Sequence, residues 1–217
     1  MDIHILDQSN SVINSYLAEM RAVGVQDDRM RFRHNIRRIG QLMAYEVSKT
    51  LEYAPREVTT PLGVATVQMP EENIVVGTIL RAGLPMHEGV LDVFDKAENC
   101  FVSAYRAYDE NHGVEIHLGY AATPRLDGKV LIVADPMLAT GKSMVSTLRQ
   151  LLKYGVPRHI HILSIIGAQP GVDYLVENPI GVEATLWAAT VDGQLNSDSY
   201  IVPGLGDAGD LAYGTKE

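Results

Sequence analysis

The stretch with the clearest chemical meaning joins an apolar strand to a helix and places an acid before an anion-binding turn. The apolar run ends at Asp135, and the chain passes through Thr140-Gly141 into an amphipathic pattern over residues 143–154. Backbone N–H groups at a helix N-terminus, backed by the positive end of the helix dipole, bind phosphate. Gly141 lets the ligand approach because it has no Cβ, and the Thr140 and Ser143 hydroxyls add donors. Asp135 can accept hydrogen bonds from sugar hydroxyls, so the pattern favours a sugar phosphate over phosphate alone.

Two other interpretations of this stretch exist. An ordinary strand–loop–helix connection would carry no chemistry, but it does not account for a terminal acid followed by Thr-Gly-x-Ser. Gly141-Lys142-Ser143 also matches the end of a P-loop, which needs a glycine five residues before Gly141. That position holds Pro136. The sequence therefore gives little support to a nucleotide-binding kinase or nucleoside triphosphatase.

The elements that must position this turn form an alternating pattern. Short apolar runs, rich in β-branched residues, are separated in several places by helical patterns, which predicts a parallel sheet buried on both faces. The runs are residues 73–80, 100–106, 129–135, 159–167 and 183–190. We therefore predict an α/β fold with a parallel central sheet flanked by helices. The chain, 1–217, is interpreted as one domain with a core over about 71–191 and flanking segments, 1–70 and 192–217, that form a small hood.

The flanking segments have their own patterns. One amphipathic helix is expected around Val12, Tyr16 and Met20, and a longer one begins at Asp27 or Asp28. The longer helix has an apolar face and a basic face, made respectively of Phe32, Ile36, Ile39, Met43 and Val47 and of Arg29, Arg31, Arg33, Arg37 and Arg38. The arginines favour a solvated face or a subunit contact, with phosphate contact left open. Residues 57–69 predict a hairpin, and the chain from residue 192 onward shows neither a helical nor a strand period.

Composition limits the class of protein. The chain has 217 residues, 46% of them hydrophobic and 21% charged, with a formal charge of −9. No apolar run is long enough for a membrane span, and the N-terminus does not resemble a signal peptide. Cys100 is the single cysteine, so an intrachain disulfide and a multi-cysteine zinc site are excluded. We expect a cytoplasmic protein with no membrane partner and no nucleic-acid partner, because the negative charge repels polyanions.

Three segments resemble uracil phosphoribosyltransferases of the type I phosphoribosyltransferase class. Residues 135–143, DPMLATGKS, are similar to the family's phosphoribosyl pyrophosphate (PRPP) loop, which usually has glycine where this chain has Lys142. Residues 79–84, ILRAGL, are similar to its loop after an earlier strand. Residues 200–210, YIVPGLGDAGD, followed by Gly214-Thr215, match its base-recognition segment almost letter for letter. Weaker similarity runs through residues 31–46.

The resemblance implies an active site assembled from these segments. The implied catalytic residues are Arg81, Arg106, Asp135 and Asp207. The implied PRPP contacts are Arg81, Arg106, Asp135, Pro136, Met137, Leu138, Ala139, Thr140, Gly141, Lys142, Ser143 and Asp207. The implied uracil contacts are Ile201, Gly206, Asp207 and Ala208. Both arginines end apolar runs and are expected beside the loop, while Lys142 is expected to point outward.

The same resemblance implies pyrimidine salvage, in which uracil and PRPP give UMP and pyrophosphate. Mg²⁺ is the implied cofactor, held mostly by substrate oxygens and water, with no protein metal ligand assigned. Residues 107–125 depart most from the family and are expected to cover the pyrophosphate. A homodimer or tetramer is implied, and the N-terminal helices are a candidate subunit surface. Two alternatives remain: a transferase for another base, and a regulatory RNA-binding protein on the same fold.

Overall fold

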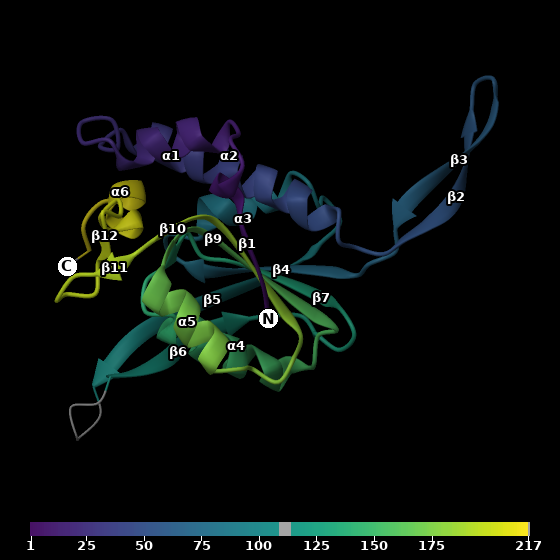
Figure 1. Cartoon of the computed structure of the whole chain (residues 1–217). Helices are drawn as coiled ribbons and strands as arrows, with labels where there is room; N and C mark the ends of the chain where they lie inside the picture. The colour runs from purple at the N-terminus through teal and green to yellow at the C-terminus, as the bar shows by residue number, and fades with distance from the viewer. Residues whose placement is uncertain (109–113, 217) are drawn as a thin grey trace.

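The computed structural model describes the backbone of residues 1–108 and 114–216, and their side chains except those of 104–108 and 114–119. A mostly parallel sheet forms the centre (Figure 1). Its strands follow the order β1 (Asp2–Ile5), β10 (Ala184–Asp192), β9 (His159–Ala168), β7 (Val130–Ala134), β4 (Ile74–Leu80), β5 (Glu98–Tyr108) and β6 (Val114–Ala122). A short strand, β8 (Met137–Leu138), also pairs with β9. The predicted α/β class is confirmed, because each of the five apolar runs forms a strand.

Besides the short β8, strands β1 and β6 of this sheet were not predicted. β1 pairs in parallel with β10, with His4 opposite Trp187, although only helices are predicted in the N-terminal part of the chain. β6 runs antiparallel to β5 and lies in the segment expected to be a covering loop. Four residues such as Asp2–Ile5 are too few to show a period, so only the partner strand decides their conformation.

Helices cover both faces of the sheet (Figure 1). On one face lie α1 (Ile13–Arg21), α2 (Arg29–Ser48) and α3 (Leu84–Leu91); on the other lie α4 (Lys142–Leu151) and α5 (Gln169–Glu177). Neighbouring residues on a strand point to opposite faces. Accordingly, Ile132 of β7 packs in the core beneath α2, while Leu131 packs in the core beneath α4.

The apolar face predicted for the long helix is confirmed. Its five residues, from Phe32 to Val47, are at most 1% exposed. Asp28 caps α2 by accepting a hydrogen bond from the Arg31 backbone at 3.1 Å. In α1 the predicted stripe is confirmed at Met20, which is buried, and wrong at Val12, which is 50% exposed. Tyr16 is partly buried, and Ile13 and Leu17 take the buried positions instead. The predicted apolar face of α2 lies in the chain's own core, whereas Met30 and Tyr45 of the same helix are exposed.

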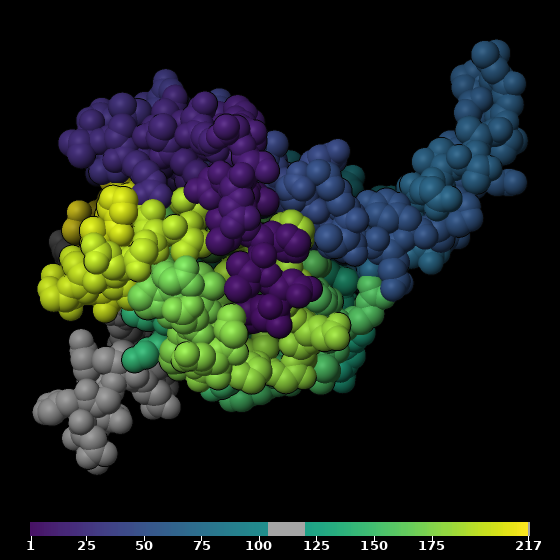
Figure 2. Space-filling model, viewed as in Figure 1, coloured from purple at the N-terminus to yellow at the C-terminus, as the bar shows by residue number. Residues whose placement is uncertain are grey.

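A long hairpin projects from the body (Figures 1 and 2). Its strands are β2 (Tyr53–Thr60) and β3 (Gly63–Pro70), paired from Tyr53 with Pro70 to Thr60 with Gly63. The predicted hairpin is therefore confirmed and is longer than expected. Its apolar side chains are largely exposed, including Val58, Leu62, Val64, Val67 and Met69.

The C-terminal segment has regular structure that its sequence did not predict. It forms β11 (Gln194–Leu195), β12 (Ile201–Val202) and α6 (Ala208–Tyr213). Its apolar residues join the same core as α1 and α2: Ile201, Leu205, Ala208 and Ala212. The helices α1 and α2 thus pack with the C-terminal segment over one end of the sheet, whereas β1 joins the sheet and the β2–β3 hairpin projects from the body (Figure 1). Two 3₁₀ turns, Leu6–Gln8 and Leu152–Tyr154, complete the described elements. In the described part of the chain, no helix has the length and apolar character needed to cross a membrane.

Candidate active site

The predicted phosphate loop follows the carboxyl end of β7. The Asp135 backbone N–H still donates to Leu163 of β9 at 3.0 Å, and Met137 then pairs with Ile166 in the short strand β8. The turn comes at Gly141, which has a φ of 73°, and α4 begins at Lys142. The strand-terminal acid and the helix-opening turn therefore lie where the sequence predicts them. Backbone N–H groups of the first turn of α4 are free to meet an anion, as at other helix N-termini.

The turn is held by a second glycine that sequence reasoning missed. A Cβ at Gly141 would lie 2.6 Å from the carbonyl oxygen of Gly171, in the first turn of α5. A Cβ at Gly171 would lie 2.3 Å from the carbonyl oxygen of Ala139. Two backbones can approach this closely only where neither has a side chain. The phosphate loop is thus wedged against α5, and the sequence around Gly171 gives no signal of this contact.

The predicted base-recognition segment begins on a buried residue and ends in a capped helix. Ile201 is 4% exposed, whereas Gly206 is exposed with a φ of 95°. Asp207 caps α6 by accepting from the backbone N–H of Asp210 at 2.9 Å. Backbone groups between Ile201 and Ala208 are therefore fixed at both ends, which suits main-chain recognition of a flat ring.

The phosphate loop and the base-recognition segment meet. The backbone N–H of Ala208 donates to the Met137 sulfur at 3.3 Å, across 71 residues of sequence. Arg81, directly after β4, reaches the same segment: its guanidinium donates to the Asp210 carboxylate at 3.1 Å and to the Gly214 carbonyl at 3.4 Å. Three segments that are far apart in the sequence therefore line one region at the carboxyl ends of the parallel strands, where α/β folds bind ligands.

This arrangement agrees with the comparisons with known proteins. The family model described as uracil phosphoribosyltransferase matches residues 8–215. The chain belongs to this family. It is 51% identical, over the full length of both chains, to the uracil phosphoribosyltransferase of Porphyromonas gingivalis. It is 39% identical to that of Methanothermobacter thermautotrophicus over 99% of this chain and 96% of the relative.

Solved structures agree on the fold. The AQ2163 protein from Aquifex aeolicus is similar with a TM-score of 0.85 and 32% identity, over 98% of each chain. A hypoxanthine phosphoribosyltransferase from Staphylococcus aureus has a TM-score of 0.51 at 10% identity, over 86% of this chain and 83% of the other. The second likeness concerns the fold alone, which is that of the type I phosphoribosyltransferases.

Within this family site, Asp135 has an unusual protonation equilibrium. Burial raises the pKa of its carboxyl group to about 7, although a hydrogen bond from the Met137 backbone at 3.3 Å acts in the opposite direction. A carboxylate that is poorly solvated favours partners that compensate its charge. Sugar hydroxyls or a cation carried by a substrate would supply that compensation.

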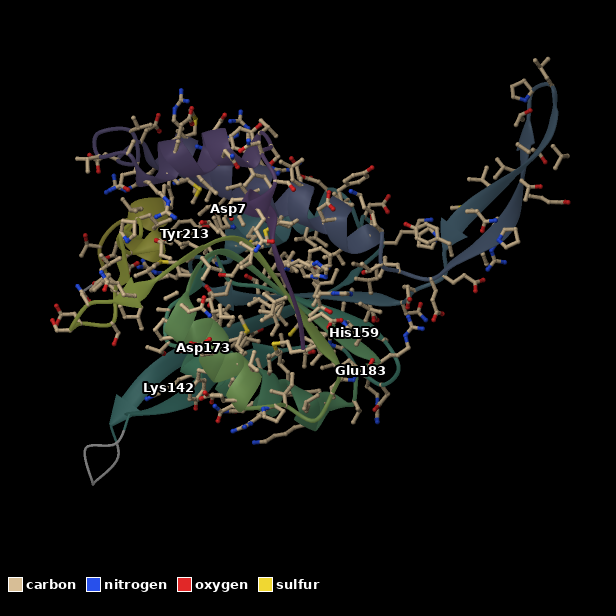
Figure 3. All side chains as sticks on the ribbon, viewed as in Figure 1. Asp7, Lys142, His159, Asp173, Glu183 and Tyr213 are labelled. Carbon is tan, nitrogen blue, oxygen red and sulfur yellow. The ribbon has the colours of Figure 1, made fainter. Side chains whose placement is uncertain are left out.

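Two predicted residues need separate comment. Arg106 lies inside β5, opposite Ile116 of β6, and not at the strand end where we expected it; its side chain falls outside the described residues. The expectation for residues 107–125 likewise falls partly outside the described residues, although 114–122 form β6. Lys142 is exposed at the start of α4 (Figure 3), as predicted.

The arginines of α2 contact other parts of the chain. Arg33 donates to the Ala212 carbonyl of α6 at 2.7 Å, and Arg37 forms a bidentate pair with Asp92 at 2.7 Å. Arg31 pairs with Glu19. Arg29, Arg31, Arg37 and Arg38 are nevertheless exposed, so the solvated face predicted for α2 is confirmed for four of its five arginines. Arg33 is partly buried and ties α6 to α2.

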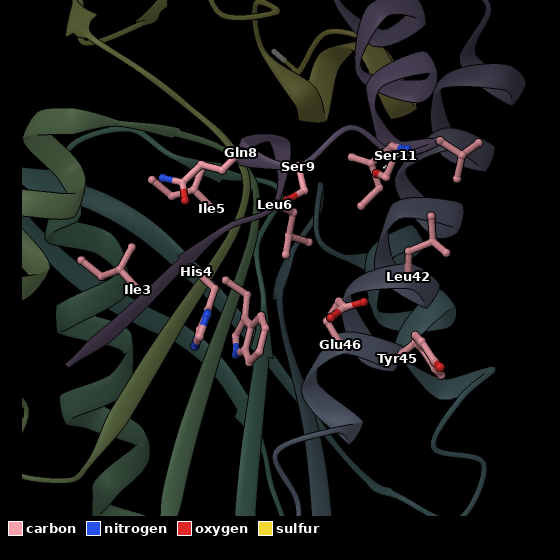
Figure 4. A pocket seen from close by; sticks show the side chains of 13 residues that line it. Ile3, His4, Ile5, Leu6, Gln8, Ser9, Ser11, Leu42, Tyr45 and Glu46 are labelled. Carbon is pink, nitrogen blue, oxygen red and sulfur yellow. Dashed lines mark hydrogen bonds between the residues drawn. The ribbon is translucent and has the colours of Figure 1, made fainter.

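A cavity of about 410 Å³ lies between β1 and the C-terminal half of α2 (Figure 4). The His4 ring stacks on the Trp187 ring with 4.2 Å between the ring centroids. The Trp187 indole N–H donates a hydrogen bond to His161 Nδ1 at 3.2 Å. Burial lowers the pKa of His161 to about 3, so its ring is neutral and able to accept. The described lining of this cavity includes none of the predicted site residues, so we regard the aromatic group as part of the fold.

Proposed function

We propose that this chain transfers the phosphoribosyl group of PRPP to uracil, giving UMP and pyrophosphate in pyrimidine salvage. The contact between Ala208 and Met137 carries the proposal, because it brings the base-recognition segment and the phosphate loop of the family to one place. A contact between residues this far apart in the sequence can also arise from core packing alone. Here, however, both segments resemble motifs of the family whose model matches residues 8–215.

The chemistry assigned to the chain's own residues is positioning and charge stabilisation. The bond from the anomeric carbon to pyrophosphate breaks as the bond to the uracil nitrogen forms, with oxocarbenium-like character between. The turn at Gly141 and the Thr140 and Ser143 hydroxyls would hold the 5′-phosphate, and Asp135 would accept from the ribose hydroxyls. Arg81 would face the leaving pyrophosphate, since a planar cation with several donors stabilises the negative charge that develops there.

Mg²⁺ is part of the proposal. Among the side chains that the structure describes, which leave out those of 104–119, no three His, Cys, Asp or Glu converge on a metal site. The raised pKa of Asp135 fits a nearby cation, which would favour the ionised carboxylate. Mg²⁺ bound to pyrophosphate would neutralise its charge, held by substrate oxygens and water with Asp135 beside it.

We also propose a homodimer or tetramer in the cytoplasm. A two-stranded hairpin that projects into solvent is marginally stable alone, and the β2–β3 hairpin exposes Val58, Leu62 and Val67. A second copy would cover these side chains. Light scattering during size exclusion tests this: a monomer at micromolar concentration would contradict it, and Val67→Glu should weaken the assembly.

Turnover resolved by base tests the proposed function directly. With PRPP, Mg²⁺ and uracil, we expect UMP and pyrophosphate in equal amounts. Competition among uracil, cytosine, xanthine and hypoxanthine should leave uracil the preferred substrate, and another preference would overturn the choice of base. No UMP at a generous enzyme concentration would overturn the activity itself. A regulatory RNA-binding role would show as a salt-dependent RNA shift, which the charge of −9 disfavours.

A further inference from the structure

A partly buried ion pair outside the residues assigned above holds the turn of the base-recognition segment. Arg21 ends α1 and Asp192 ends β10, so the pair joins the N-terminal hood to the central sheet. We propose that Arg21 and Asp192 are positioning residues that set the affinity for the base by fixing this turn. The inference rests on the proposed function, since it concerns the uracil side of the same site.

The pair has the geometry of a strong and specific contact. The two guanidinium nitrogens of Arg21 each donate to one carboxylate oxygen of Asp192, both at 2.8 Å. The Asp192 side chain is 9% exposed and that of Arg21 is 25% exposed. Burial raises the pKa of Asp192, but the hydrogen bonds from Arg21 and Gly204 outweigh it, so the pKa lies below its usual value. The carboxylate is therefore ionised at neutral pH.

Both backbone groups of Gly204 are held by this pair. The Gly204 N–H donates to Asp192 at 2.8 Å, and its carbonyl accepts from Arg21 at 3.1 Å. Gly204 has a φ of 60°, and a Cβ there would lie 2.0 Å from the Ile201 carbonyl oxygen. The turn is thus tightly folded, and its central peptide groups are satisfied by side chains from α1 and β10.

The turn lies between the residues expected to contact the base. Ile201 precedes Gly204 by three residues, and Gly206 follows it by two. Recognition through main-chain groups depends on where the backbone lies, because a displacement of about 1 Å removes a hydrogen bond and costs up to about a hundredfold in rate. Buried ion pairs contribute little net stability compared with apolar residues of similar size. A role in placing the backbone explains why this pair is buried here.

The experiment compares variants that remove the pair with a matched pair elsewhere. Arg21→Met with Asp192→Asn removes both charges and avoids leaving one buried and unpaired. Arg21→Lys keeps the charge but loses the bidentate geometry. The control is Arg37→Met with Asp92→Asn, because Arg37 and Asp92 form an equally short bidentate pair away from this turn. KM for uracil and for PRPP, kcat, and binding of UMP and of ribose 5-phosphate are measured, with circular dichroism as the check on folding.

We expect the Arg21/Asp192 double variant to raise KM for uracil about tenfold and to weaken UMP binding similarly, by about 1.4 kcal/mol. KM for PRPP and the affinity for ribose 5-phosphate should change less than about twofold, because the phosphate loop is held by other contacts. Arg21→Lys should give a smaller rise, and the Arg37/Asp92 control should give none.

A folded double variant with unchanged KM for uracil and a lowered melting temperature would show a purely structural pair and overturn the proposal. Equal rises in both KM values, or failure of both the double variant and Arg21→Lys to fold, would overturn it as well. If the wild-type chain neither makes UMP nor binds it, the proposed function fails and this inference fails with it. Normal wild-type turnover with unaffected variants would reject the inference alone.

Discussion

The phosphate loop and the base-recognition segment reach the same site by different means. The loop is built locally: β7 delivers Asp135, Gly141 makes the turn, and α4 supplies the helix N-terminus within a few residues. The base-recognition segment forms only a two-residue strand and a six-residue helix, and it is held by contacts from α1, α2, β8 and β10. The conformation of the phosphate loop is decided by its own residues. The conformation of the base-recognition segment depends on contacts with distant parts of the chain. Variants in the two regions should therefore fail in different ways.

Asp135→Asn should have the largest effect on turnover, a loss of at least about a hundredfold, because it removes the charge that the proposed function assigns to the ribose hydroxyls. The same substitution should make the folded chain more stable at neutral pH. The usual carboxyl pKa of 3.8 rises to about 7 in the folded chain, so folding becomes less favourable as pH rises from about 4 to 7. Asparagine removes the free-energy cost of ionising the buried carboxyl group. A shift of about three pKa units corresponds to no more than about 4 kcal/mol.

Denaturant unfolding of this variant and the wild-type chain at pH 4 and pH 8, alongside steady-state turnover, checks both parts. We expect equal stability at pH 4 and a more stable variant at pH 8. A variant that is less stable than wild type at pH 8 would contradict the raised pKa.

Gly141→Ala should reduce turnover about thirtyfold and raise KM for PRPP more than KM for uracil. The left-handed φ and the 2.6 Å approach to Gly171 both resist a Cβ, so the loop must move away from α5. Gly181→Ala is the matched control, because Gly181 has a φ of 81° with nothing within 4 Å of its Cβ position. Steady-state kinetics of both variants separates the backbone penalty, shared by the two, from the loss of the loop's position. An equal effect of the two on turnover would count against the loop's role.

Met137→Leu tests the point where the two regions touch. Leucine has nearly the volume of methionine but no sulfur to accept from the Ala208 N–H, so packing is kept and the 3.3 Å contact is lost. We expect KM for uracil to rise about threefold, with stability changed by less than about 1.5 kcal/mol. Initial-rate measurements at saturating PRPP give this value. If KM for uracil stays the same, the two regions meet without influencing each other.

Lys142→Gly, which restores the residue usual in the family loop, should have the smallest effect. Lys142 is exposed at the helix start, and the proposed function assigns the phosphate to backbone N–H groups. We expect KM for PRPP to change by less than about twofold, measured at two salt concentrations. A larger, salt-dependent loss would assign the Lys142 ammonium to the bound phosphate.

Some features of the molecule can be read directly from neighbouring residues. The apolar run before Asp135, the Thr-Gly turn and the five-residue face of α2 have periods or turn chemistry that local backbone geometry imposes. These predictions were confirmed, because the residues that decide them lie within one or two turns of one another. The stripe predicted for α1 was right at Met20 and wrong at Val12, because a nine-residue helix shows too few repeats to fix which face is buried.

The sequence by itself thus determined five strands of the sheet, the long helix, the phosphate turn and the family to which its motifs belong. Only the tertiary structure decided that β1 joins the sheet and that Gly171 packs closely against the phosphate loop. It also decided that Arg21 and Asp192 form hydrogen bonds with Gly204. The contacts of Arg21 span 171 and 183 residues. Such contacts leave no local period or turn signal, because they depend on where the whole chain brings its distant segments together.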